Sequence, residues 1–201
     1  TRLDEQLLAS EPPFIKAAAS EGDFFVARTK DAYSLDGYYA DGGFEKAFKA
    51  VVREFKRARD FGFTAGEYDR ARSEYLRNFE NSYTDRAKIN STTYAQECAR
   101  HFTKDEPMPG IETEFQMMKM LAPQIPVEAI NQLLPQIQPD SNLVILLMNT
   151  ASEKCYSRDE ILAAYHEVMA ETLTPYEDKV STEPLLDYEP QGSVKSQQTG
   201  K

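Results

Sequence analysis

The spacing of apolar residues changes its period near residue 44, and this change constrains the fold more than any other feature of the sequence. Before it, apolar side chains alternate, as Tyr33 and Leu35 do, which is typical of a strand with one buried face. From Phe44 onward they recur every three or four residues, which is the period of an amphipathic helix. We therefore predict antiparallel strands within residues 14–40, followed by helices.

The first long helix is predicted to begin at Phe44 and to end before Gly62, a residue type favoured just after helices. Two capping boxes mark later helix starts, Thr64-Ala65-Gly66-Glu67 and Ser157-Arg158-Asp159-Glu160. The last helix should run to about residue 172. Further helices are predicted near 2–10, 85–103, 111–122 and 126–137. The apolar stripe of the first long helix consists of Phe44, Ala47, Phe48, Val51, Val52, Phe55 and Ala58.

Residues 143–148 are apolar at every position, which favours a central strand with both faces buried. The order of elements is then helix, strands, several helices, strand and helix. This order indicates an α+β fold, in which helices cover one face of a mostly antiparallel sheet. Residues 1–173 are predicted to form one domain. Residues 174–201 lack periodicity and end in a polar run, so we expect a linker or tail, poorly ordered near its end.

The charge and the two ends of the chain limit its partners and compartment. A formal charge of −10 repels phosphate backbones, which argues against nucleic-acid binding. No stretch approaches the ~20 apolar residues needed to cross a bilayer. The chain opens at Thr1 in what reads as the middle of a helix, so we expect a segment of a longer protein. The compartment therefore stays unknown from these features.

The chain contains only two histidines, and the residues around them limit the hydrolytic chemistry that it can perform. After His101, an inverted zinc motif needs Glu and His, but Lys104 and Asp105 stand there. After His166, the H-E-x-x-H order needs a second His where Ala170 stands. Without paired imidazoles a catalytic zinc is held poorly. We predict no metal ligand and no catalytic residue in this chain.

The remaining chemical features have ordinary structural interpretations. Cys98 and Cys155 form no metal or redox motif; unpaired thiols packed as small hydrophobic groups are the preferred interpretation, and a disulfide is the alternative. An aromatic helix face could bind peptides, but core packing is preferred. Strand edges within 14–40 could also accept an extended peptide. The aromatic face consists of Tyr68, Tyr75, Phe79 and Tyr83.

Several short motifs stand in order along the chain: Arg2-Leu3-Asp4-Glu5, Pro12-Pro13-Phe14, Gly22-Asp23-Phe24, Arg28-Thr29-Lys30-Asp31-Ala32, Arg59-Asp60-Phe61-Gly62-Phe63-Thr64 and Glu106-Pro107-Met108-Pro109-Gly110-Ile111-Glu112. Together they resemble the large bacterial members of the pitrilysin/insulinase family of zinc peptidases. The resemblance covers residues 1 to about 173, and residues 176–186 resemble the linker to a following domain.

The resemblance implies a clamshell peptidase of two halves, each with two similar α+β domains. The first domain of such a protein carries the zinc motif, and the second lacks it and helps enclose the substrate chamber. This chain is similar to that second domain, begun partway, so its sheet is expected to lack strands or to be completed by another copy. Zinc would belong to the upstream domain of the parent. In active members an Arg, followed seven residues later by Tyr, holds the substrate backbone. Arg2 falls at a comparable place and is the one substrate-binding candidate, but Ala9 stands where the Tyr would be.

These features predict a non-catalytic domain that helps form the substrate chamber of a parent zinc metallopeptidase. The chain alone is predicted to be inactive. Its expected partners are other domains of the same polypeptide, the peptide substrate of the parent and, for the isolated piece, a second copy. A periplasmic or cell-envelope location is what the resemblance implies. Two alternatives stay open: a binding or assembly module of an inactive homologue, and an unrelated helical adaptor.

Overall fold

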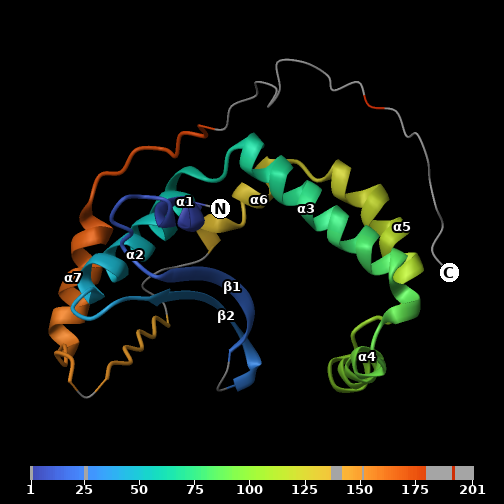
Figure 1. Ribbon diagram of the computed structural model, residues 1–201, viewed down its shortest axis with the longest axis horizontal. Helices are drawn as coiled ribbons and strands as arrows, with labels where there is room; N and C mark the ends of the chain where they lie inside the picture. The colour runs from blue at the N-terminus through green and yellow to red at the C-terminus, as the bar shows by residue number, and fades with distance from the viewer. Residues whose placement is uncertain (1, 25–26, 137–141, 151, 180–191, 193–201) are drawn as a thin grey trace.

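The structure is a computed structural model that describes residues 2–24, 27–136, 142–150, 152–179 and 192. Its elements are α1 (Arg2–Leu7), β1 (Lys16–Phe24), β2 (Ala27–Tyr38), α2 (Phe44–Phe61), α3 (Ala65–Thr84), α4 (Ser91–Lys104), α5 (Ile111–Leu121), α6 (Val127–Asn131) and α7 (Arg158–Ala170), with 3₁₀ turns at Arg86–Lys88, Ala122–Gln124 and Leu134–Gln136. They form an arch with the hairpin, α2 and α7 on one side and α3, α4 and α5 on the other (Figure 1). A small antiparallel sheet combined with helices confirms the predicted α+β class.

Strands β1 and β2 form the antiparallel hairpin predicted within residues 14–40. Lys16 lies opposite Tyr38 and Ala19 opposite Leu35. Because side chains alternate between the two faces of a strand, one face turns toward α2. The buried Ala17 and the half-buried Leu35 lie on that face. The hairpin and α2 thus form two packed layers.

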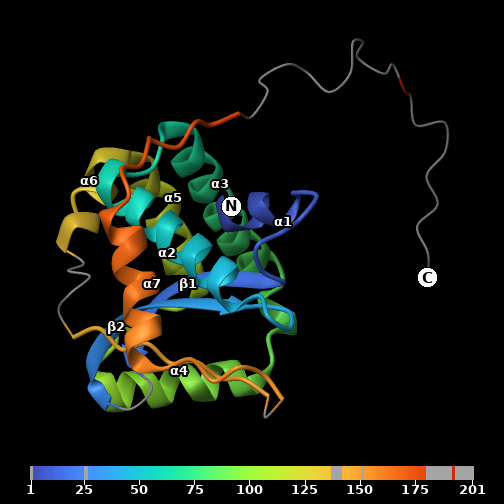
Figure 2. The same ribbon diagram turned by 90° about the vertical axis from the view of Figure 1, so that its left-hand side faces the viewer.

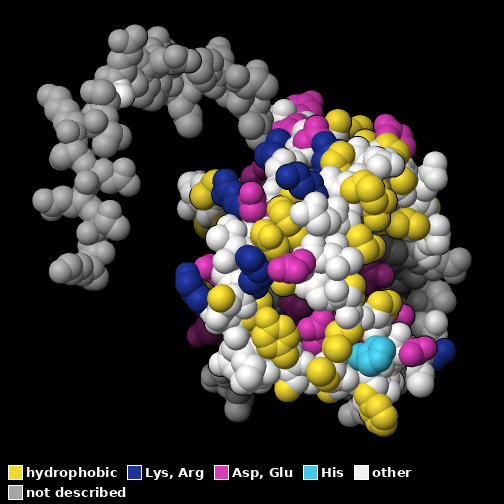
Figure 3. All heavy atoms as spheres, turned by 90° about the vertical axis from the view of Figure 1, so that its right-hand side faces the viewer, with side chains coloured by type: hydrophobic (Ala, Val, Ile, Leu, Met, Phe, Trp, Pro, Cys, Tyr) yellow, Lys and Arg dark blue, Asp and Glu magenta, His cyan; other side chains and the backbone are white. Residues whose placement is uncertain are grey.

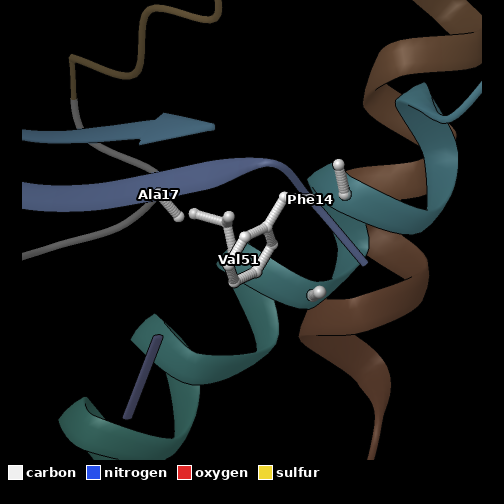
Figure 4. Packing of buried hydrophobic residues seen from close by; sticks show 5 residues of the cluster. Phe14, Ala17 and Val51 are labelled. Carbon is white, nitrogen blue, oxygen red and sulfur yellow. The ribbon is translucent and has the colours of Figure 1, made fainter. Parts of the chain in front are cut away.

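Helix α2 lies between the hairpin and α7 and contributes to both hydrophobic clusters (Figure 2). On one side Val51 packs against Phe14 and Ala17, which point toward it (Figure 4). On the other side Val52 packs against residues of α7, including Val168, which has no exposed surface. The predicted apolar stripe of this helix is confirmed, since all seven of its residues are buried or half-buried.

A sharp corner joins α2 to α3. Gly62 has a φ of 74°, and a Cβ there would lie 2.6 Å from the Asn131 Cγ atom. The Asn131 amide uses this space: its Nδ2 donates to the Phe63 carbonyl oxygen at 3.0 Å, and its Oδ1 accepts from the Phe63 N–H at 2.8 Å. Thr64 and Glu67 then form the predicted capping box at the start of α3. The second predicted box, at Ser157 and Glu160, is also present.

The far side of the arch is less well packed than the sequence predicts. Helix α4 has no buried residue, and Phe102 on its predicted apolar side is 90% exposed. In the aromatic face of α3, Tyr83 stacks on Phe115 of α5, with ring centroids 5.1 Å apart. Tyr75, however, is 50% exposed, so core packing is wrong for that residue. Figure 3 shows apolar side chains reaching the surface of this side among charged ones.

Several sequence predictions about elements are wrong. The helix expected near 2–10 ends at Leu7, and the one expected near 85–103 begins at Ser91, after a 3₁₀ turn. The helix expected over 126–137 ends as α6 at Asn131, and a 3₁₀ turn follows that contains Pro135, whose ring and missing N–H are incompatible with a helix interior. The central strand expected at 143–148 is not a strand of the described sheet, which has only β1 and β2. Its residues are extended, but no described strand lies beside them to complete a ladder.

Part of the predicted linker lies against the domain. Residues 171–179, which we call the strap, cross α2 and the start of α3. The end of the chain that we predicted to be poorly ordered lies outside the described residues, except for Gly192. Among the described helices, none is long and apolar enough to cross a membrane.

Candidate functional site

Arg2, the one substrate-binding candidate, is buried at the start of α1, with 8% of its surface exposed. Its Nε donates to Glu67 Oε1 at 2.6 Å, and its Nη2 donates to Glu67 Oε2 at 2.8 Å. Nη2 also donates to the Gly62 carbonyl oxygen at 2.8 Å. A two-point pair of this kind matches the fork of the guanidinium to the carboxylate. The pair joins α1 to the corner between α2 and α3.

Two aromatic rings flank the Arg2 guanidinium. Its central carbon lies 5.2 Å from the ring centroid of Phe63 and 4.5 Å from that of Tyr176. Both distances suit an attraction between a cation and the face of an aromatic ring. The Tyr176 hydroxyl lies 2.7 Å from both carboxylate oxygens of Glu5 and donates to that carboxylate. Tyr176 therefore links the strap to α1 at two points.

Further ion pairs hold the strap along its length. Arg53 Nε and Nη2 each donate to the Glu171 carboxylate at 2.6 Å. Arg57 Nε donates to the Thr174 carbonyl oxygen at 3.2 Å. Arg70 of α3 pairs with Asp178 at 3.0 and 3.2 Å. Basic residues of α2 that lie off its apolar stripe thus find acidic partners, which sequence analysis could not identify.

The contacts around Arg2 shift the pKa values of Glu67 and Tyr176. Burial alone would raise the pKa of the Glu67 carboxyl, but hydrogen bonds from Arg2 and Thr64 outweigh burial and hold that pKa below its ordinary value. Burial, together with the adjacent Glu5 carboxylate, raises the pKa of Tyr176 to about 12. At neutral pH, Glu67 is therefore ionised and Tyr176 carries its proton.

An open cavity of about 610 Å³ lies between α1, α2 and the strap. Its lining includes charged groups of both signs, the acidic Glu5 and Glu177 and the basic Arg57 and Lys179. The Glu5 carboxylate is already occupied by the Tyr176 hydroxyl. The cavity therefore combines charged groups of both signs with the aromatic ring of Tyr176. Its lining consists of Glu5, Arg57, Thr174, Pro175, Tyr176, Glu177 and Lys179.

The two histidines lie on separate helices and on the surface. His101 of α4 has its Nδ1 2.6 Å from the Glu106 carbonyl oxygen. His166 of α7 lies edge-on to the ring of Tyr165, with centroids 5.5 Å apart. Among the residues that the structure describes, no group of three or more His, Cys, Asp or Glu side chains could hold a metal ion.

Both cysteines are unpaired and exposed, Cys98 on α4 and Cys155 just before α7. The expectation that the two thiols pack as small hydrophobic groups is therefore wrong for both. The reason differs between them: α4 does not pack its apolar side, and Cys155 lies in an irregular segment beside the surface. The alternative of a disulfide is not formed here either.

Sequence reasoning found Arg2 but missed the residues that surround it. Glu67 was identified only as a capping residue, although its carboxylate serves both the cap and Arg2. Tyr176 was placed in a linker. One signal was present for Tyr176, because residues 176–186 resemble a segment of the family, whereas Glu67 lies outside the resembling motifs. No sequence spacing, however, relates residues 2, 67 and 176 to one another. A substrate contact by Arg2 stays a prediction.

The fold is that of a domain of the insulinase-type proteases. In particular, it is similar to the first half of the periplasmic protease PqqL from Escherichia coli, at 22% identity and a TM-score of 0.69, over 88% of this chain and 38% of that one. The full PqqL structure gives a TM-score of 0.71 at 23% identity, over 98% of this chain and 22% of that one. A predicted insulinase family protease from Yersinia pestis gives 0.69 at 14% identity, covering 84% and 36%.

A curated sequence relative agrees with these structural matches. The zinc protease PQQL-like protein of Arabidopsis thaliana is 31% identical over 96 residues, which are 48% of this chain and 10% of that protein. No protein-family model matches the chain. The resemblance to pitrilysin and insulinase peptidases is thus confirmed, and the chain spans a tenth of the length of its curated relative and less than two fifths of the matched structures.

Proposed function

We propose that this chain is a non-catalytic domain of a zinc metallopeptidase, in which it shapes the chamber that receives peptide substrates. The observation that carries the proposal is the match of 88% of the chain to the first half of a periplasmic protease. The zinc would be held by another domain of the parent polypeptide. Zinc in such enzymes activates a water for attack on the scissile carbonyl. This chain would supply walls and contacts.

The arrangement of charges supports a role in contacts between domains. The strap lies on α1, α2 and α3 through ion pairs and rings, so a following domain would be attached to a fixed surface. Peptide substrate and neighbouring domains are the partners in this proposal. A periplasmic location for the parent is part of it, supported by the location printed for PqqL.

The first test measures the chain alone. Zinc content is determined on the purified chain, and hydrolysis of a quenched peptide library is followed with and without a chelator. We expect less than about a tenth of an equivalent of zinc and no cleavage. One tight equivalent of zinc with chelator-sensitive cleavage would overturn the proposal.

The second test measures the parent polypeptide with and without residues 1–173. We expect the deleted parent to keep its zinc and to lose cleavage of peptides, because the chamber is opened. A parent that binds no zinc and cleaves nothing, even when complete, would instead favour a binding or assembly module. A deleted parent with unchanged cleavage would contradict a role in the chamber.

A further inference from the structure

The strap is held on the domain by its side chains more than by its backbone. Among the described residues it forms one backbone–backbone hydrogen bond, from the Glu171 N–H to the Val168 carbonyl oxygen at 3.1 Å. Its residues are half-buried or exposed, and none is buried. Segments with few backbone hydrogen bonds and little buried surface open locally at a low free energy. The strap should therefore detach more readily than the two hydrophobic clusters unpack.

The start of α3 is shaped to receive Asp178 of the strap. The Arg70 guanidinium donates to both oxygens of the Asp178 carboxylate, and the Thr64 hydroxyl donates to its Oδ2 at 3.4 Å. A Cβ on Gly66 would lie 2.4 Å from that oxygen, so the glycine leaves room for the carboxylate. Glycine is a poor helix former relative to alanine. The first turn of α3 thus accommodates the strap rather than favouring its own helix.

Helix α1 depends on contacts with the rest of the domain. It has six residues, and isolated helices shorter than about 12 residues are marginal in water. Leu3 packs against the hydrophobic cluster between α2 and the hairpin. The Tyr176 ring lies on the Arg2 guanidinium, and its hydroxyl donates to the Glu5 carboxylate. Contacts from the core and from the strap therefore both hold α1 in place.

We propose that α1 and the strap form one conformational unit, which we call the clasp, and that its two segments open and close together. Because Tyr176 contacts α1 at two points, detachment of either segment removes contacts that hold the other. Such coupling is reciprocal, so loosening either segment must loosen the other. The closed clasp keeps Arg2 buried, so a ligand reaches the guanidinium only when the clasp is open. The clasp would operate whether or not the parent is a peptidase.

The first test measures opening of the strap in the 201-residue chain by limited proteolysis with chymotrypsin. This protease takes a hydrophobic side chain into its pocket, so cleavage after Tyr176 requires the ring to leave Arg2. Leu3→Ala loosens α1 and should raise the rate of that cleavage at least about threefold. Leu8→Ala is the matched control, since it makes the same change in a side chain that is 86% exposed, and it should leave the rate unchanged. Cleavage after the buried Phe44 reports global unfolding and should stay slow in both variants.

The second test measures the coupling in the opposite direction and does not require Leu3→Ala to fold. Asp178→Ala removes the contacts of the strap with Arg70 and Thr64 at the start of α3. It should raise the hydrogen-exchange rate of residues 2–8, followed by mass spectrometry, at least about threefold. Glu177→Ala is the matched control, because it removes the neighbouring, exposed carboxylate, and it should leave that rate unchanged. Exchange in α2, which reports the packed core, should stay the same in both variants.

Several results would overturn the coupled opening of the clasp. One is an unchanged rate of cleavage after Tyr176 in Leu3→Ala, or an equal rise in Leu8→Ala. Another is a rise that occurs only together with cleavage after Phe44, because the strap would then detach only when the whole domain unfolds. Equal exchange of residues 2–8 in Asp178→Ala and the wild-type chain would show that α1 stays in place without the strap, and would overturn it as well.

Discussion

The Arg2 guanidinium forms a two-point ion pair with the Glu67 carboxylate across 65 residues of sequence, and both side chains are more than nine-tenths buried. Glu67 also accepts from the Thr64 N–H in the capping box of α3. One carboxylate therefore starts a helix and fixes the N-terminal helix α1. Removing either partner leaves the charge of the other buried and unpaired, so substitutions in this pair test the structure directly.

Glu67→Gln should lower the free energy of unfolding by about 3–5 kcal/mol, because Arg2 stays charged and buried without a carboxylate. The glutamine oxygen can still serve the capping box. Adding Arg2→Met to Glu67→Gln should recover a large part of the loss. Glu160→Gln, the same change in the exposed capping box of α7, is the control and should cost much less. Urea denaturation of these three variants and of Arg2→Met alone measures this, and additive effects of Arg2→Met and Glu67→Gln would contradict the buried pair.

The same pair predicts a dependence of stability on acid. The folded pKa of Glu67 is below its ordinary value, so its stabilising contribution is complete above about pH 4.3 and is lost as the pH falls through the lower folded pKa. Wild-type stability should therefore fall in acid more steeply than that of Glu67→Gln. Urea midpoints taken at descending pH values measure the slopes. Parallel slopes for the two proteins would refute this explanation.

The raised pKa of Tyr176 predicts that stability is also lost in alkali. Its pKa is raised to about 12, so its neutral hydroxyl stabilises the fold below about pH 10, and that contribution is lost as the pH rises toward the folded pKa. Ultraviolet titration of the tyrosines should show one fewer late-ionising group in Tyr176→Phe. Glu5→Gln, which removes the acceptor carboxylate, should bring this ionisation to lower pH. An unchanged titration in both variants would show that the contact does not form.

Gly62→Ala should destabilise the chain by about 2 kcal/mol, since φ is 74° there and a Cβ would meet the Asn131 side chain at 2.6 Å. Gly22→Ala is the matched control, because nothing lies within 4 Å of the added carbon. Thermal unfolding compares the two. Equal effects would mean that the corner between α2 and α3 does not need glycine.

Val168→Ala should cost about 2 kcal/mol, because Val168 is fully buried between α2 and α7 and its loss leaves a cavity. Leu8→Ala removes more atoms but from a side chain that is 86% exposed, so it should change stability by less than about 0.5 kcal/mol. A comparable loss in both variants would place the core elsewhere.

Local patterns predicted most of the elements correctly. The alternation around Tyr33 and Leu35 predicted the hairpin, and the apolar stripe from Phe44 predicted the face of α2 that packs. The two capping boxes began helices at the expected residues. These features depend on residues within a few positions of one another, so the sequence contains the information directly.

Burial was harder to predict because it depends on neighbours. The apolar side of α4 has the composition of a packed face, yet Phe102 and Cys98 are exposed because no described element packs on them. The segment Leu143–Met148 has the composition of a central strand, yet no described strand lies beside it. In both places the residues indicate a buried face that this chain does not itself cover.

The sequence by itself determined the α+β class, the helix starts and the inner face of α2, because periodicity and capping act over one or two turns of chain. Only the tertiary structure decided that Arg2 pairs with Glu67, that Tyr176 of the strap lies on Arg2, and that Leu143–Met148 remains without a described partner. The Arg2–Glu67 pair joins residues 65 positions apart, and the Tyr176–Glu5 contact joins residues 171 positions apart. Their formation depends on the path of the chain between them, which no local pattern specifies.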